Sequence, residues 1–310
     1  MRLRDVIGAP LALALMLVAP ARAQTPTAAP APAPAATQDA DPALWVVKDA
    51  DTTIYLFGTV HVLKPGLSWF DEAVKKAFDD SKELVLELPD LDQAAIQQAV
   101  LARAPDKSGT PLSAKLPEAE RPLYSKAIAD YAAPVGLTEP VMDRFKPWFA
   151  AITLTQLPLA KLGYDPSSGA EKVLTAAAKA ANKPISGLET IDQQLGYFDT
   201  LPEPQQIKFL ELTLKELPKE GETLDKMVKQ WAAGDPEALG ATINEGLREQ
   251  PEIGAVLLTE RNKRWASWIA DRMKQPGVVF VAVGAGHLAG KDSVQNQLTP
   301  YKITATRVNY

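Results

Sequence analysis

The two histidines of this 310-residue chain lie in the same local context, and they are the residues best suited to chemistry. His61 ends IYLFGTVH (54–61), and His287 ends VFVAVGAGH (279–287). Each is an apolar run typical of a buried strand, followed by Gly-x-x-His. Glycine permits a turn or a close approach, and imidazole is a common metal ligand and general base. The pattern predicts one shared pocket. Locally hydrogen-bonded histidines, or an old duplication without chemistry, are the alternatives.

Carboxylates are the natural third component of such a pocket, because a catalytic metal site normally adds one to its histidines. Glu87 ends the apolar run LVLELP (84–89), where a buried carboxylate is costly without a cation. Glu189, in ISGLET (185–190), is the equivalent acid of the second half. An exposed place on an edge strand is the alternative for each. Asp165 lies in a Gly/Pro/Ser loop, KLGYDPSSG (161–169). It could line the site, but we expect it to cap the next helix.

Arg261 is the candidate cation of the site. In the helical segment 256–273 it shares one face with four apolar residues, Leu257, Leu258, Trp265 and Trp268. It should therefore point inward and need an anion, either a site carboxylate or a substrate oxyanion. The alternative is that its aliphatic part lies beside tryptophan while its charge reaches solvent.

The strands that must position these residues are expected mainly toward the two ends of the chain, and helices are expected between them. Residues 45–89 predict strand, strand, helix and strand, with Ser68 and Asp71 as a capping pair for the helix. Further strands are expected at 184–190, 277–288 and 303–310, while 91–160 and 191–273 are mostly helical. The fold class is therefore α/β: a central mixed sheet built from two pseudo-symmetric halves, with a largely helical insertion. Ligand sites in such sheets collect at strand carboxyl ends.

The first 41 residues look different from the rest. Residues 1–23 have Arg2 and Arg4, an uncharged apolar stretch and a small-residue cleavage site, which together predict a cleavable signal peptide. A membrane anchor is the alternative, but the stretch is shorter than the roughly 20 residues that span a bilayer. Residues 24–41 are Ala/Pro-rich and predict a disordered linker. The domain proper is 42–310, in the periplasm or secreted, with no membrane span after signal cleavage.

Composition excludes several classes of function. Residues 1–23 hold three of the 33 basic and one of the 38 acidic residues, so the mature chain has a net charge of −7. An acidic domain without basic clusters argues against nucleic acid as a partner. The chain has no cysteine, which excludes disulfides, thiolate metal sites and a cysteine nucleophile. No G-x-S-x-G occurs, which argues against a serine esterase.

Several of these segments together resemble the TraB/GumN family over about residues 44–308. They are the GTVH that follows a strand, Glu87, GLET (187–190), ERN (260–262) before a tryptophan-containing helix, and VGAGHLAG (283–290). That family is related to the Tiki metalloproteases and, more distantly, to ChaN-like and erythromycin-esterase-like proteins. The resemblance implies a pseudo-symmetric α/β fold. It also implies, as in Tiki members, metal-dependent proteolysis with His61, His287 and Glu87 at the metal.

The sequence thus predicts a metal-dependent hydrolase acting on a peptide or protein. His61, His287 and Glu87 would bind a divalent ion, and the ligand types fit Zn, Mn or Co equally. Glu189, or Glu87 if it is not a ligand, would be the general base, and Arg261 would orient a carboxylate or stabilise an oxyanion. The alternative is a non-catalytic envelope protein that binds a metal or a haem-like ligand, or that docks a partner on its helical insertion.

Overall fold

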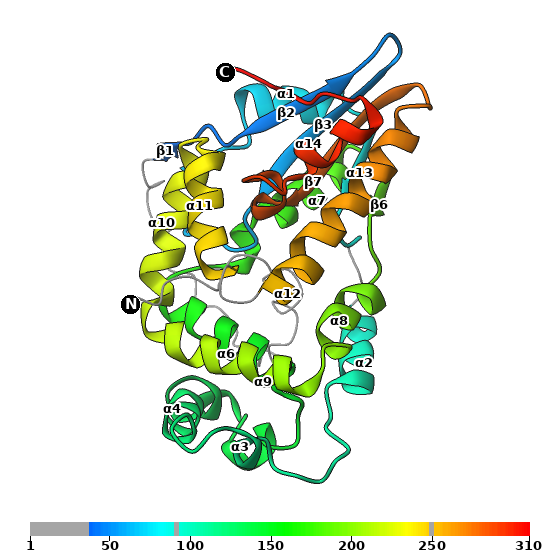
Figure 1. Ribbon diagram of the computed structural model, residues 1–310. Helices are drawn as coiled ribbons and strands as arrows, with labels where there is room; N and C mark the ends of the chain where they lie inside the picture. The colour runs from blue at the N-terminus through cyan, green and yellow to red at the C-terminus, as the bar shows by residue number, and fades with distance from the viewer. Residues whose placement is uncertain (1–36, 90–92, 248–250) are drawn as a thin grey trace.

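The computed structural model describes residues 37–89, 93–247 and 251–310 (Figure 1). The predicted signal peptide, 1–23, and most of the predicted linker, 24–41, lie outside those residues. The last linker residues are ordered, unlike the prediction: β1 (Gln38–Asp39) pairs in parallel with β4 (Leu67–Ser68), and Ala40 is buried. The folded part of the chain therefore begins before residue 42.

A six-stranded mixed sheet forms the centre of the fold, as the sequence predicts. The two halves of the chain contribute three strands each, interleaved in the order β6-β5-β7-β3-β2-β8. The pairings among β6, β5, β7 and β3 are parallel, whereas β2 is antiparallel to both β3 and β8. The strands are β2 (Leu44–Lys48), β3 (Thr52–Thr59), β5 (Glu83–Leu86), β6 (Ile185–Gly187), β7 (Gly277–Gly284) and β8 (Thr306–Arg307).

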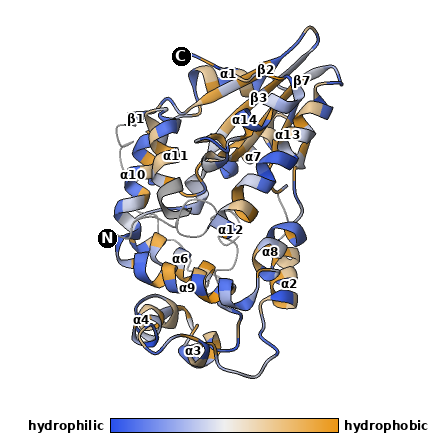
Figure 2. Cartoon of the chain, viewed as in Figure 1, coloured by the Kyte–Doolittle hydropathy of each residue, from blue (hydrophilic) through white to orange (hydrophobic). Residues whose placement is uncertain are grey.

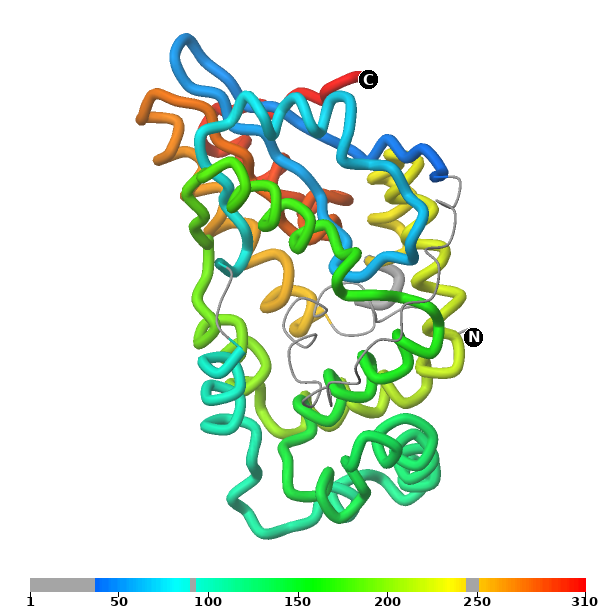
Figure 3. Tube along the Cα trace, turned by 180° about the vertical axis from the view of Figure 1, so that it is seen from behind, coloured from blue at the N-terminus to red at the C-terminus, as the bar shows by residue number. Residues whose placement is uncertain are grey.

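Helices cover both faces of this sheet, which explains the continuous apolar runs of its central strands. Phe57 and Phe280 pack on one side against α1 (Glu72–Asp80), α7 (Ala170–Ala180), α10 (Glu220–Ala232) and α11 (Pro236–Leu247). Leu56 and Val281 pack on the other side against α13 (Glu260–Arg272) and α14 (Val294–Gln297). Figure 3 shows α1 and α7 on the face opposite to α13, and Figure 2 shows the hydrophobic colour gathered on the strands.

Several element boundaries differ from the sequence prediction. The first helix begins at Glu72, because residues 67–68 belong to β4 and the Ser68 hydroxyl bonds the Asp71 carboxylate instead of the helix backbone. The strand expected at 83–89 ends at Leu86, so Glu87 lies just beyond it. The strands expected at 184–190 and 303–310 are shorter in the structure, where they form β6 (Ile185–Gly187) and β8 (Thr306–Arg307).

A largely helical region with its own core lies below the sheet in Figure 1, with α3 and α4 farthest away. It includes residues from both predicted helical stretches, and its buried aromatic residues include Tyr124, Trp148 and Phe198. No helix in the described ranges is long and apolar enough to cross a membrane. The helices are α2 (Gln93–Arg103), α3 (Leu112–Lys115), α4 (Arg121–Ala127), α5 (Glu139–Met142), α6 (Pro147–Lys161), α8 (Ile191–Asp199), α9 (Glu203–Glu216) and α12 (Pro251–Gly254).

Glu220, the first residue of α10, is a buried acid for which the described residues supply no charged partner. It is 1% exposed, and among the described residues neither of its carboxylate oxygens has a hydrogen-bond partner. Loss of hydration on burial raises the pKa of Glu220 from 4.5 to about 9. The group is therefore protonated in the folded chain at neutral pH and ionised in the unfolded chain.

We expect Glu220→Gln to remove a pH dependence of stability. Because the folded-state pKa is raised, the contribution of this group is fully present below pH 4.5 and is lost as the pH rises toward about 9. At about pH 8 the free energy of unfolding of the variant should exceed that of the wild type by roughly 2 kcal/mol or more. Urea unfolding across this pH range measures the difference, and a difference that is independent of pH contradicts the assignment. Glu222→Gln, exposed in the same turn, is the control and should behave as the wild type.

Candidate active site

The two Gly-x-x-His motifs leave neighbouring strands at the same edge of the sheet. β3 and β7 pair in parallel, and Thr59 lies opposite Gly284 at the end of both strands. On the other side of β7, Leu86 of β5 lies opposite Ala282, so Glu87 emerges beside them. Three parallel strands thus deliver the two histidines and one glutamate to a single edge of the sheet, where ligand sites of α/β folds collect.

Gly284 lies at the centre of this group. A Cβ atom at this position would lie 3.6 Å from Nε2 of His61, 3.7 Å from Cδ2 of His287 and 3.0 Å from Oε1 of Glu87. The two rings therefore flank one small space, which any larger residue at 284 would fill. The backbone N–H of Gly284 also donates to Oε1 of Glu87 at 2.6 Å, which fixes that carboxylate beside the rings.

His287 is held in one tautomer. Arg261 Nη1 lies 3.0 Å from His287 Nε2, and a guanidinium can only donate, so Nε2 accepts. The ring proton is then on Nδ1 and is donated to Oδ1 of Asn262 at 2.6 Å. Asn262 is oriented for this by its own Nδ2, which donates to Asp292 O at 2.7 Å. Burial, together with the charge of Arg261, lowers the pKa of His287 to about 3, so the ring is neutral at neutral pH.

His61 is held through the same ring atom by a different group. Its Nδ1 lies 2.5 Å from Oε1 of Glu171, in the first turn of α7, and Nε2 is left facing Gly284. Burial lowers the pKa of His61, but the charge and hydrogen bond of Glu171 outweigh burial, so the pKa is raised overall. The sequence predicts no role for Glu171 or Asn262 in holding the histidines. An acid at the start of a predicted helix was the only signal for Glu171.

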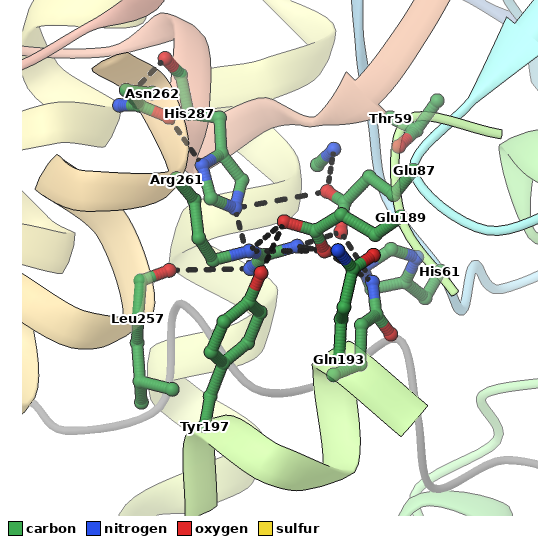
Figure 4. A network of polar contacts seen from close by, with 12 residues as sticks. Thr59, His61, Glu87, Glu189, Gln193, Tyr197, Leu257, Arg261, Asn262 and His287 are labelled. Atoms are coloured by element: carbon green, nitrogen blue, oxygen red, sulfur yellow. Dashed lines mark hydrogen bonds and ion pairs between the residues drawn. The ribbon is translucent and has the colours of Figure 1, made fainter. Parts of the chain in front are cut away.

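Arg261 points inward, as its helical face predicts, and joins two buried carboxylates (Figure 4). Nε and Nη2 donate to Glu189 at 2.9 and 2.8 Å, and Nη2 also donates to Glu87 at 2.6 Å. Nη1 donates to His287 and to the carbonyl of Leu257. All five guanidinium N–H groups are therefore used. Burial raises the pKa of Glu87, but the charge of Arg261, together with the two histidines and the hydrogen bond from Gly284 N, outweighs burial and the pKa falls to about 2.

Glu189 is as fully engaged as Arg261. Besides the arginine, its Oε1 accepts from the Tyr197 hydroxyl and its Oε2 from Gln194, each at 3.0 Å. Such a carboxylate is suited to holding Arg261 in place. Asp165 lies outside the group: its side chain accepts from Ser167 N at 2.8 Å and caps the short helix at residues 166–168, as expected.

The site does not form a closed metal centre as it stands. Across the described part of the chain, no group of three or more His, Cys, Asp or Glu side chains is arranged so that it could hold a metal ion. Arg261 already engages two of these side chains: its Nη1 donates to Nε2 of His287 and its Nη2 to one oxygen of Glu87.

Comparison with known proteins identifies the family. The chain matches the model of the TraB/PrgY/gumN family over residues 43–307, which spans almost all of the domain described above. The chain belongs to the TraB/PrgY/gumN family. A similar protein is an uncharacterized protein of Treponema pallidum (strain Nichols), 24% identical over 267 residues that cover 81% of this chain and 78% of the relative. No solved structure matches this TraB/PrgY/gumN chain.

Arg261→Met should strongly destabilise this TraB/PrgY/gumN member, because it leaves Glu87 and Glu189 buried and uncompensated. We expect a loss of about 3–5 kcal/mol in the free energy of unfolding, measured by urea denaturation. Adding Glu87→Gln and Glu189→Gln to the same chain should recover much of the loss, since the buried charges are then gone.

The control is Arg264→Met, one turn along the same helix. Arg264 is half-exposed and lies 3.9 Å from Glu189, so its loss should cost less than about 1 kcal/mol. Equal effects of the two arginine substitutions would contradict a central role for Arg261.

Proposed function

We propose that this TraB/PrgY/gumN protein is a divalent-metal-dependent hydrolase that acts on peptides or proteins. The ion would be held by Nε2 of His61, Nε2 of His287 and the carboxylate of Glu87. One observation carries the proposal: each imidazole is anchored through Nδ1 by a side-chain acceptor, and both rings turn toward one space beside a buried carboxylate. Metal-binding histidines are typically fixed through the second ring nitrogen in this way.

The types of donor suit such an ion, although the three side chains are not arranged as a metal centre in the described structure. Two imidazole nitrogens and one carboxylate are a ligand set of catalytic zinc sites, which leave one position open. These ligand types suit Zn, Mn or Co equally well. Use of His287 Nε2 by an ion requires Arg261 to release that lone pair. The two hydrogen bonds from Arg261 to Glu189 can keep the guanidinium at the site when it does so.

The chain's own residues then have distinct tasks. A divalent ion bound there would polarise a scissile carbonyl and lower the pKa of a water molecule. Arg261 has no spare donor in the present arrangement. Once it releases His287 and Glu87, two of its N–H groups can meet a substrate carboxylate or a developing oxyanion. A role for Glu189 as general base would require it to leave Arg261, Tyr197 and Gln194. We therefore assign Glu189 to the positioning of Arg261.

The rest of the chain favours an exported protein whose partner is not nucleic acid. The N-terminal segment 1–23 has the composition of a cleavable signal, which favours the periplasm or secretion. The acidic balance of the mature chain disfavours nucleic acid as a partner.

A non-catalytic envelope protein that binds a metal or a haem-like ligand is the second candidate. The observation that favours it is that Arg261 already supplies a hydrogen-bond partner to His287 and a charge partner to Glu87. Such a site could serve binding alone, with Arg261 exchanged for a ligand.

Metal analysis of the purified protein tests the proposal. After loading with Zn, Mn or Co in turn, the wild type should retain about one equivalent, whereas His61→Ala and His287→Ala should lose it with little change in unfolding midpoint. Hydrolysis of a peptide library should depend on the retained ion and stop on chelation. Glu222→Gln, exposed on α10, serves as the control and should keep both properties.

Two results would redirect this assignment. Stoichiometric metal in a protein that lacks both histidines rejects these ligands. Tight binding by the wild type without turnover of any library peptide supports the non-catalytic candidate.

A further inference from the structure

The backbone on both sides of His61 is bound to one distant segment, residues 165–171 (DPSSGAE). Asp165 N donates to Leu63 O at 3.1 Å, and Ala170 N donates to Val60 O at 2.9 Å. The loop that carries His61 is therefore held at both ends by the turn that leads into α7. Neither contact depends on the side chain of His61.

Gly169 brings this segment into direct contact with His61. A Cβ atom at position 169 would lie 2.0 Å from the carbonyl oxygen of His61 and 2.7 Å from its carbonyl carbon. Real Cβ atoms do not approach so closely, so any other residue would push the histidine loop away. The φ angle of Gly169 is −61°, which every residue adopts. Close approach is thus the reason for glycine here.

Glu171 completes the contact through its side chain. Its Oε1 accepts from His61 Nδ1 and from the Thr59 hydroxyl, each at 2.5 Å. It lies in the first turn of α7, where the helix dipole stabilises a negative charge. A carboxylate in this place keeps the ring proton on Nδ1 and leaves the Nε2 lone pair directed at the space beside Gly284.

We propose that Glu171 is the positioning residue of His61, and that Gly169 fixes the loop on which this depends. Glu171 sets both the orientation and the tautomer of the ring, as Asn262 does for His287 with a neutral amide. The consequence for metal affinity rests on the function proposed above. Loss of a side chain that orients a metal ligand typically weakens metal binding 10- to 100-fold.

The tautomer can be measured directly, because the chain has only two histidines. Long-range ¹H–¹⁵N spectra of the metal-free protein, at a pH where both rings are neutral, should show two rings protonated on Nδ1, and His61→Ala assigns them. Glu171→Met keeps most of the side-chain volume and removes both acceptor oxygens. It should convert His61 to the Nε2-protonated form and leave His287 unchanged.

Two further variants separate positioning from general damage to the fold. Glu171→Gln keeps an acceptor oxygen and should retain the wild-type tautomer. Asn262→Ala should alter His287 and leave His61 unchanged. If Glu171→Met does not fold, Glu171→Ala removes the same oxygens in less space and tests the same point. A His61 ring that stays protonated on Nδ1 without Glu171 overturns the inference.

Zinc affinity, measured by competition with a chromophoric chelator, separates this inference from the proposed function. We expect Kd to rise 10- to 100-fold in Glu171→Met and to recover in part in Glu171→Gln. A tautomer change in a protein whose wild type binds no metal rejects the metal proposal and leaves the positioning role intact. Unchanged zinc affinity and an unchanged tautomer in Glu171→Met reject the positioning role and leave the metal proposal intact.

Discussion

The parallel pairing of β3 with β7 is the constraint on which the rest of the site depends. The two strands come from opposite ends of the sequence, yet Thr59 lies opposite Gly284, so both strands end at the same level. The Gly-x-x-His segments at the ends of these strands therefore lie at the same edge of the sheet. A shift of one residue in the register would turn every side chain of a strand to the other face. Both faces are apolar, so the close packing of particular side chains opposes that shift: Phe57 and Phe280 on one face, Leu56 and Val281 on the other.

One arginine, Arg261, compensates the negative charges of the buried glutamates at this edge of the sheet. Arg261 and the glutamates at 87 and 189 are each less than a tenth exposed, and a buried charge is tolerated only with partners. Arg261 donates three of its five N–H groups to these two carboxylates and the other two to His287 and the carbonyl of Leu257. In the described part of the chain no hydrogen bond or ion pair joins Glu189 to either histidine, so Glu189 can hold the guanidinium if His287 and Glu87 change partner. The metal ion proposed above would require such an exchange.

Much of this could be predicted from the sequence, because it depends on local pattern. Apolar runs that end in Gly-x-x-His, an acid after a short strand, and a helical face with Arg261 among apolar residues are all visible without coordinates. Glu171 and Asn262 were missed, since each acts through a contact with a remote histidine that no spacing rule reports. The start of α1 was predicted at Ser68, but the helix begins at Glu72 for a related reason. Ser68 belongs to β4, and the strand that pairs with β4 lies in the predicted linker.

The two motifs are alike in sequence and yet give the histidines different acid–base character. A carboxylate holds His61 and raises its pKa, whereas burial and Arg261 lower the pKa of His287, which is bound to an amide. Neither partner belongs to a Gly-x-x-His motif: Glu171 comes from the first turn of α7 and Asn262 from α13. The repeated motif therefore fixes where each ring lies, and the elements between the two motifs determine its protonation. Duplication of a strand-end histidine can supply two similar positions, but two different chemical roles require the unrepeated helices that separate them.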